Sequence, residues 1–396
     1  MAGALEGVKV VELSTMIAGP LCGQFLADHG AEVIKVESPA GDPARDAAPE
    51  LAGVGAYFAG TNRNKSVLAL DLKQQSGCDV LWRLLGDADV FVENLLPGTL
   101  ARWGLDYPAL SARLPRLIHC SVTGFGADGP LGGRPGYDAV LQAYCGLMSI
   151  NGQPGTGTTR MGVAIVDIAT GMNAGMGVLL ALAARERTGR GQYVDVTLYD
   201  SALALLHPFA SNWFGSGATA GPIGNGHPTL VPYDKFKTRD GEIFIGVAVP
   251  GQFRRLMQLL ERPELGTDPR FATGPGRVAN RAALCEILEP LVAEQATLAF
   301  SERLMAAGVP AAPVHTVPQA LNAPHTAHRG MRVEMPNGYR GVGIPVKLSD
   351  TPGQARTPPR PFAGDSDAIL ARYGYSADEI AALRAQDVLP SERAPG

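Results

Sequence analysis

The feature that most constrains the fold is an alternation of short apolar strands with helical segments, which begins at the start of the chain. Gly7–Leu13 predicts a strand, Ser14–Pro20 a turn and Leu21–His29 a helix, and Ala31–Glu37 predicts a second strand. Two strands joined through a helix form a βαβ unit, whose strands run parallel. This part of the chain therefore predicts an α/β fold, a parallel sheet with helices packed on its faces.

The same alternation continues along the first half of the chain. Further strands are expected at Ser66–Leu70, Asp89–Val92, Leu117–Val122 and Val194–Leu198, with helices at Gln75–Leu85 and Asp200–Trp213. A hairpin is predicted over Tyr233–Val247, followed by helices at Gln252–Leu260, Asn280–Ala293 and Leu298–Ala307. A strand from Gly341 to Leu348 and helices at Asp365–Tyr373 and Ala377–Gln386 complete the pattern. At 396 residues, two folding units are expected. They are a large domain of residues 1–221 and 329–396 and a smaller α+β domain of residues 222–328.

Composition and charge argue against several classes of binding partner. The net charge is −4 and basic residues form no stripe, which argues against nucleic acid and anionic membranes as partners. Apolar runs stay shorter than about 18 residues, and no signal pattern opens the chain. The five cysteines and seven histidines are scattered without ligand spacing. We therefore expect a cytoplasmic protein with free thiols and no bound metal.

Asp167 is the strongest candidate for a reactive side chain. A short apolar stretch leads into it, and a long helix of small residues follows over Met172–Ala184. Backbone N–H groups and the helix dipole are expected to keep an acid at this point ionised. Two interpretations stay open for such a carboxylate, namely a helix cap and a nucleophile.

Three polar clusters are candidates for holding a phosphorylated cofactor at the carboxyl edge of the sheet. They are residues 62–65 with 71–73, residues 93–98 with 102–104, and residues 134–138. The first turn, over residues 14–23, lacks a G-x-G-x-x-G pattern, which argues against NAD or FAD. A G-x-S-x-G motif is also missing from the sequence, which argues against a nucleophile-elbow hydrolase. Asp138 and Asp167 are candidates for a carboxylate pair, although their spacing alone does not join them.

Several short motifs in a fixed order resemble those of family III CoA-transferases, the formyl-CoA transferase or CaiB–BaiF type. They are Gly7–Pro20 continuing to Gly30–Glu37, Asn62–Ser66, Val92–Asn94 with Pro97–Gly98, Ser121–Gly126, Pro135–Asp138, Thr188–Gln192, Gly308–Val314 and Lys347–Pro352. The resemblance spans the whole chain. It implies a Rossmann-like CoA-binding large domain, a smaller domain and a homodimer of interlocked chains.

The resemblance also assigns roles to particular residues. The catalytic aspartate of the family aligns with Asp167. The positions that match CoA contacts are Ala18, Leu70, Lys73, Asn94, Arg102, Trp103 and Tyr137. Ser38 stands where some members carry an arginine beside the adenine, and Arg45 is a candidate substitute. Ile17 replaces the glutamine of the oxalate-using member, which argues against formyl or oxalate specificity.

Three functions remain open for a chain with these motifs. The first is CoA transfer between carboxylic acids, in which Asp167 forms an anhydride and then a CoA thioester. The second is α-methylacyl-CoA racemisation, which needs two acid–base groups. Racemases place a histidine where this chain has Tyr137, and a tyrosine is a poor base at neutral pH, so transfer is favoured. The third is CoA binding without catalysis.

The acceptor acid is constrained only weakly. Arg134, Arg160 and His227 are candidates for binding a second carboxylate, which favours succinate or a five-carbon relative. The glycine-rich segment Gly215–Gly226 is either a lid that excludes water from the reaction or a linker between domains.

Overall fold

A computed structural model describes residues 2–393, and the chain divides into two compact units. The first unit comprises the residues up to 147, residues 161–211 and the residues from 324 onward. The second comprises residues 148–160 and 212–323. Each unit has its own hydrophobic core, so each is described by itself.

A six-stranded parallel sheet forms the centre of the first unit. Its spatial order is β5 (Lys65–Ala69), β2 (Glu32–Glu37), β1 (Lys9–Leu13), β6 (Val90–Glu93), β7 (Ile118–Thr123) and β8 (Tyr193–Thr197). All five pairings are parallel, which confirms the expected α/β fold with a large parallel sheet. The chain moves outward from β1 to β5 and then returns to β6 on the other side of β1. Ligands of such sheets bind at this switch point, outside the carboxyl ends of the strands.

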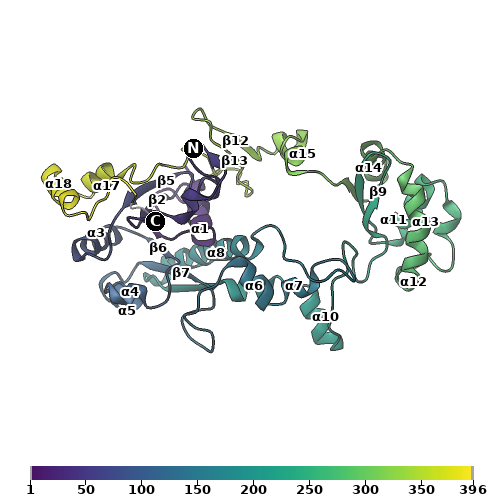
Figure 1. The fold of residues 1–396 in the computed structure, drawn as a ribbon, viewed down its shortest axis with the longest axis horizontal. Coiled ribbons are helices and arrows are strands. Elements are labelled where there is room, and N and C mark those ends of the chain that lie inside the picture. The colour runs from purple at the N-terminus through teal and green to yellow at the C-terminus, as the bar shows by residue number, and fades with distance from the viewer. Residues whose placement is uncertain (1, 394–396) are drawn as a thin grey trace. The chain divides into compact units, whose positions relative to one another are not determined.

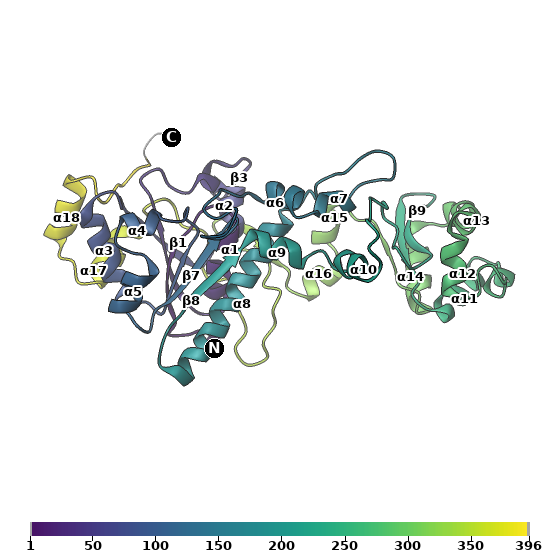
Figure 2. The same ribbon diagram turned by 90° about the horizontal axis from the view of Figure 1, so that it is seen from below.

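Helices cover both faces of this sheet (Figures 1 and 2). Successive strand residues point to opposite faces, so Val10 and Val11 belong to different cores. Val10 packs in the core that includes α1 (Ala18–Asp28) and α8 (Ile165–Thr188). Val11 packs in the core formed with α3 (Gln75–Leu85), α17 (Ser366–Arg372) and α18 (Ala377–Ala385).

Helices α1 and α8 pack closely because glycines face α1 along α8. A Cβ added at Gly171 would lie 2.7 Å from the Ala18 carbonyl oxygen, and one at Gly175 would lie 3.0 Å from Phe25 Cδ1. Helix α8 is 24 residues long and, by length and composition, apolar enough to cross a membrane. Helices in protein cores pass the same test, and α8 packs on α1 and the sheet. The expected absence of a membrane partner stays a prediction.

The second unit is built around a small antiparallel sheet. Strands β9 (Tyr233–Lys237) and β10 (Glu242–Gly246) form the predicted hairpin, and β11 (Ala311–Pro313) pairs with the other edge of β10. Helices α11 (Pro250–Leu259), α13 (Arg281–Ala293) and α14 (Thr297–Ala306) lie within two residues of the predicted ranges. Their apolar residues pack with the sheet in one core.

Shorter elements connect these parts. They are η1 (Pro43–Asp46), β3 (Glu50–Leu51), β4 (Val54–Gly55), α2 (Ala56–Thr61), α4 (Thr99–Arg102), α5 (Tyr107–Arg113), α6 (Asp138–Tyr144), α7 (Leu147–Ile150), η2 (Pro263–Gly266), α12 (Gly274–Ala279), α15 (Val317–Leu321) and α16 (Pro324–His328).

Two predicted elements were wrong. The single helix expected over 200–213 is two helices, α9 (Leu198–Ala204) and α10 (Phe209–Ser216), and Pro208 between them has no N–H to continue a helix. The strand expected over 341–348 is reduced to β13 (Arg340–Val342), which pairs with β12 (Arg332–Glu334) rather than with the large sheet. Pro345 cannot donate to a strand ladder, which disfavours a longer strand.

Candidate active site

Asn94 makes two hydrogen bonds to the turn at the switch point of the large sheet. Asn94 follows β6, and its Oδ1 accepts a hydrogen bond of 2.9 Å from the Thr15 N–H. Its Nδ2 donates to the Thr15 carbonyl oxygen over 2.8 Å. Both polar atoms of the amide therefore hold the turn that joins β1 to α1, and α1 begins at Ala18 directly beyond that turn.

Asp167 lies in the first turn of α8 but does not cap it. The cap position is Ala164, whose methyl side chain has no acceptor. Asp138 takes this role, because its Oδ1 accepts from the Val166 N–H over 2.7 Å and from the Asp167 N–H over 3.3 Å. A carboxylate there also complements the positive end of the helix dipole. The interpretation of Asp167 as a helix cap is therefore wrong.

Asp138 is itself fixed by a buried glutamine. Gln142 Nε2 donates to Asp138 Oδ2 over 2.6 Å, and Gln142 Oε1 accepts from the Met161 N–H over 2.8 Å. Asp138 and Gln142 are both buried. The chain thus brings two acids, separated by 29 positions, to one helix terminus. Asp138 and Asp167 were both candidates from the sequence, but no sequence pattern indicated that they lie side by side.

The environment of Asp167 disfavours its charge. Burial, and secondarily the charge of Asp138, raise the pKa of Asp167 to about 6. Asp167 is therefore still mainly ionised at neutral pH, as expected, but desolvation and a second carboxylate outweigh the helix dipole and raise its pKa rather than lower it. A carboxylate whose pKa lies near the working pH is typical of catalytic sites.

Helix packing places Asp167 beside the start of α1. Gly171 is one helical turn after Asp167, so both residues share a face of α8. That face contacts α1, because the space beyond Gly171 is occupied by the Ala18 carbonyl and the Leu21 side chain. The turn held by Asn94 and the turn that carries Asp167 are therefore neighbours.

Three of the residues that match CoA contacts line a single pocket. Lys73, Arg102 and Trp103 border a cavity of about 630 Å³ between α3 and the α4–α5 segment. Trp82 and Arg113 border it too, and the Arg113 guanidinium lies 4.0 Å from the centre of the Trp82 ring. Cations and aromatic faces in one cavity suit a nucleotide that carries phosphates.

The other four residues occupy different surroundings. Ala18 and Asn94 lie at the switch point described above. Leu70 is fully buried in the core beside α3, and its N–H donates to the Glu37 carbonyl oxygen over 2.8 Å. Tyr137 directly precedes Asp138 and is 69% exposed.

Two other groups predicted to bind cofactor are engaged inside the protein. Arg63 forms a bidentate pair with Asp28, and Lys65 pairs with Glu12. Arg45, the candidate for the adenine-side arginine, is buried and bound to both carboxylate oxygens of Glu37, so its proposed contact with adenine stays a prediction.

The residues considered for a second carboxylate lie in different units. Arg134 is an exposed residue of the first unit, whereas Arg160 and His227 belong to the second. His227 Nδ1 accepts from the Thr229 N–H over 3.2 Å. Neither unit brings all three together.

The sequence matches the model of CoA-transferase family III over residues 5–366. This chain belongs to CoA-transferase family III. The resemblance drawn from its motifs is thereby confirmed.

Related family III CoA-transferases cover nearly the same length. The succinate–glutarate CoA-transferase of Agrobacterium fabrum is 37% identical, over 92% of this chain and 94% of its own. The succinyl-CoA:glutarate CoA-transferase of Homo sapiens is also 37% identical, over 90% of this chain and 83% of its own. A crystal structure of a CaiB/BaiF family protein from Brucella suis superposes with a TM-score of 0.86 at 39% identity, covering 94% of this chain and all of that one. The protein is therefore an enzyme of the CoA-transferase class, which uses CoA thioesters as substrates.

Proposed function

We propose that this CoA-transferase moves CoA between carboxylic acids through covalent intermediates on Asp167. The Asp167 carboxylate attacks the thioester carbonyl, the carbon–sulfur bond breaks, and CoA leaves as its thiolate. The resulting mixed anhydride is attacked at the aspartyl carbonyl by that thiolate, which releases the donor acid and leaves an aspartyl-CoA thioester. The acceptor carboxylate then repeats both steps in reverse, which regenerates Asp167.

One observation carries this proposal. Asp167 is a partly buried carboxylate whose pKa is raised to about 6, at a helix start that abuts the switch point of the sheet. Such a group is mainly ionised at neutral pH, yet poorly solvated, which suits a nucleophile. Backbone N–H groups at the start of α1 are the proposed donors to the developing oxyanion.

The test is to trap the intermediates. Wild-type protein incubated with an acyl-CoA and then hydroxylamine should carry a hydroxamate on Asp167, visible by peptide mass. Asp167→Ala should yield no adduct and lose CoA transfer by at least about 10³-fold. Substantial transfer by that variant would exclude Asp167 as the nucleophile. Deuterium incorporation at the α-carbon of a 2-methylacyl-CoA, without any free acid, would instead support racemisation.

The proposed acids are dicarboxylates, with succinyl-CoA as a donor. The two relatives described above are named for succinyl and glutaryl substrates. A panel of monocarboxylic and dicarboxylic acids tested with one donor would decide this point. A preference for monocarboxylic acids would contradict it.

The nucleotide end of CoA is proposed to bind in the pocket bordered by Lys73, Arg102 and Trp103. Arg102→Ala should raise the KM for acyl-CoA about tenfold with little change in kcat, because the residue lies away from the reacting carbonyl. An unchanged KM would place the nucleotide elsewhere.

We further propose that the enzyme is a homodimer of interlocked chains. Helix α8 exposes Met172, Met176 and Leu180, which are spaced four residues apart and are 66%, 55% and 66% accessible in the single chain. A continuous apolar stripe of this kind suits a second protein surface. The glycine-rich segment Gly215–Gly226 remains our candidate lid, with Gly224 bound to the Gly152 carbonyl near its end.

A further inference from the structure

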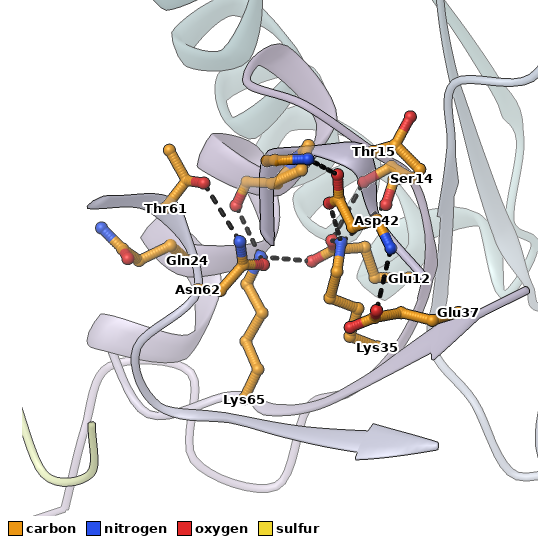
Figure 3. Close-up of polar contacts among 12 residues, drawn as sticks. Glu12, Ser14, Thr15, Gln24, Lys35, Glu37, Asp42, Thr61, Asn62 and Lys65 are labelled. Carbon is orange, nitrogen blue, oxygen red and sulfur yellow. Dashed lines mark hydrogen bonds and ion pairs between the residues drawn. The ribbon is translucent and has the colours of Figure 1, made fainter. Parts of the chain in front are cut away.

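A buried charge network lies beneath the turn between β1 and α1 (Figure 3). It consists of Glu12, Lys35, Asp42 and Lys65, each at most 1% exposed. Lys35 Nζ lies 3.1 Å from Glu12 Oε1 and 3.1 Å from Asp42 Oδ2. Lys65 Nζ lies 2.7 Å from Glu12 Oε2. Two ammonium groups and two carboxylates therefore compensate one another out of contact with water.

The network binds the backbone of the turn on both sides of Met16. Asp42 Oδ1 accepts from the Met16 N–H over 3.1 Å, and Lys35 Nζ donates to the Ser14 carbonyl oxygen over 2.6 Å. Beyond the turn, Lys65 Nζ donates to the Pro20 carbonyl oxygen in the first turn of α1 over 2.7 Å. In Figure 3 these labelled side chains converge near Ser14 and Thr15. Glu12 comes from β1, Lys35 from β2, Lys65 from β5 and Asp42 from the loop before η1.

Met16 has a backbone conformation that it would not adopt without support. Its φ is +68°, in the left-handed region that residues with a Cβ disfavour by about 1–2 kcal/mol. The hydrogen bond from its N–H to Asp42 is a direct source of that support. Because Ile17 and Ala18 follow at once, the conformation of Met16 sets where α1 starts. The Ala18 carbonyl in turn touches the Gly171 face of α8, one turn from Asp167.

We propose that Asp42, held by Lys35, is a positioning residue for the transfer reaction. It keeps Met16 in the left-handed conformation and thereby fixes the start of α1 against the turn that carries Asp167. The inference rests on the proposed function of Asp167. Buried ion pairs are a weak source of net stability, so a role in geometry accounts for the network better than stability alone.

The test compares two buried acids at opposite ends of α1. Asp42→Asn leaves one acceptor oxygen where the carboxylate has two, so the side chain can no longer accept from both Lys35 and the Met16 N–H. Asp28→Asn weakens the buried pair with Arg63 at the far end of α1. Both variants should lower the thermal unfolding temperature. We expect Asp42→Asn to lower kcat at least tenfold with a smaller change in KM, and Asp28→Asn to keep kcat within twofold.

A substitution at Met16 separates positioning from stability. Glycine adopts positive φ without steric cost. The double variant Met16→Gly with Asp42→Asn should therefore have a kcat at least threefold higher than that of Asp42→Asn alone. Equal losses of kcat in the Asp42 and Asp28 variants, after correction for the folded fraction, or no recovery with glycine, would overturn the proposal.

If Asp42→Asn fails to fold, substitutions at Met16 alone test whether its conformation affects the rate, with Asp42 and Lys35 unchanged. Met16→Val disfavours positive φ more strongly than Met16→Leu, which serves as the control for side-chain size. The valine variant should lose at least fivefold in kcat relative to the leucine variant, and equal rates would overturn the inference. A wild-type protein that transfers no CoA between acids would overturn the proposed function itself.

Discussion

At the scale of single residues, the site depends on one carboxylate, Asp167, whose ionised form is disfavoured by its surroundings. Asp167 is desolvated and faces Asp138, and together these raise its pKa to about 6. The folded protein therefore binds a proton at Asp167 more tightly than the unfolded chain does. Reactivity and stability are opposed at this position, as is common at catalytic sites.

Because the ionised form of Asp167 is disfavoured in the folded protein, removing its charge should stabilise the fold. Asp167→Asn should raise the free energy of unfolding at pH 7 by about 3 kcal/mol, because the unfavourable ionised state is lost. The wild type loses this stability as the pH rises from about 4 to about 6 and Asp167 ionises. The extra stability of Asp167→Asn should therefore vanish below about pH 4. Urea unfolding at pH 7 and pH 3.5 measures both values. A variant less stable than the wild type at pH 7 would contradict the raised pKa.

The same pKa predicts the acid limb of the activity. Since the ionised carboxylate attacks the thioester, kcat should fall about tenfold per pH unit below about pH 6. Asp138→Asn removes the neighbouring charge while keeping an oxygen that can accept from the Val166 N–H, so the limb should move to lower pH. A pH profile of both proteins with one acyl-CoA tests this. An unmoved limb would show that Asp138 does not influence the charge of Asp167.

At the scale of secondary-structure elements, the contact between α1 and α8 decides the geometry of the site. The two helices approach closely because glycines of α8 face α1. The remote cap from Asp138 in α6 then fixes the first turn of α8. Three elements far apart in the chain thus determine where one carboxylate lies.

A single methyl group should disturb this contact. In Gly171→Ala the new Cβ would lie 2.7 Å from the Ala18 carbonyl oxygen, a backbone atom that can move only with α1. We expect a loss of about 1–3 kcal/mol in stability and a lower kcat. Gly60→Ala is the matched control, because a Cβ there meets no atom of residues 2–393 within 4 Å apart from its chain neighbours and the backbone of its own helix, and should cost nothing. Normal activity in Gly171→Ala would show that the spacing of α1 and α8 is not critical.

At the scale of the whole molecule, the exposed stripe on α8 bears on the proposed dimer. Met172, Met176 and Leu180 lie on the same helix that carries Asp167. A second chain seated there would therefore couple assembly to the active site.

Sedimentation analysis of charge variants tests this coupling. Wild-type protein should sediment as a dimer, and Met176→Lys should shift it towards monomer with loss of activity, because a buried lysine is costly at an interface. Glu186→Lys, an exposed position near the end of the same helix, is the control and should remain dimeric. A monomeric wild type would remove the dimer from the proposal.

Local sequence patterns were enough to predict the parallel α/β sheet, the hairpin of the second unit and the position of Asp167 at a helix start. These depend on apolar periodicity and turn residues that lie within about ten positions of one another. Three features came only from the folded chain: Asp138 caps α8, Arg63 and Lys65 are bound inside the protein, and Asp42 accepts from the Met16 N–H. The residues joined by those contacts are at least 26 positions apart in the chain. Local sequence patterns do not predict these contacts, because the contacts form only where strands and helices that are distant in the chain pack together.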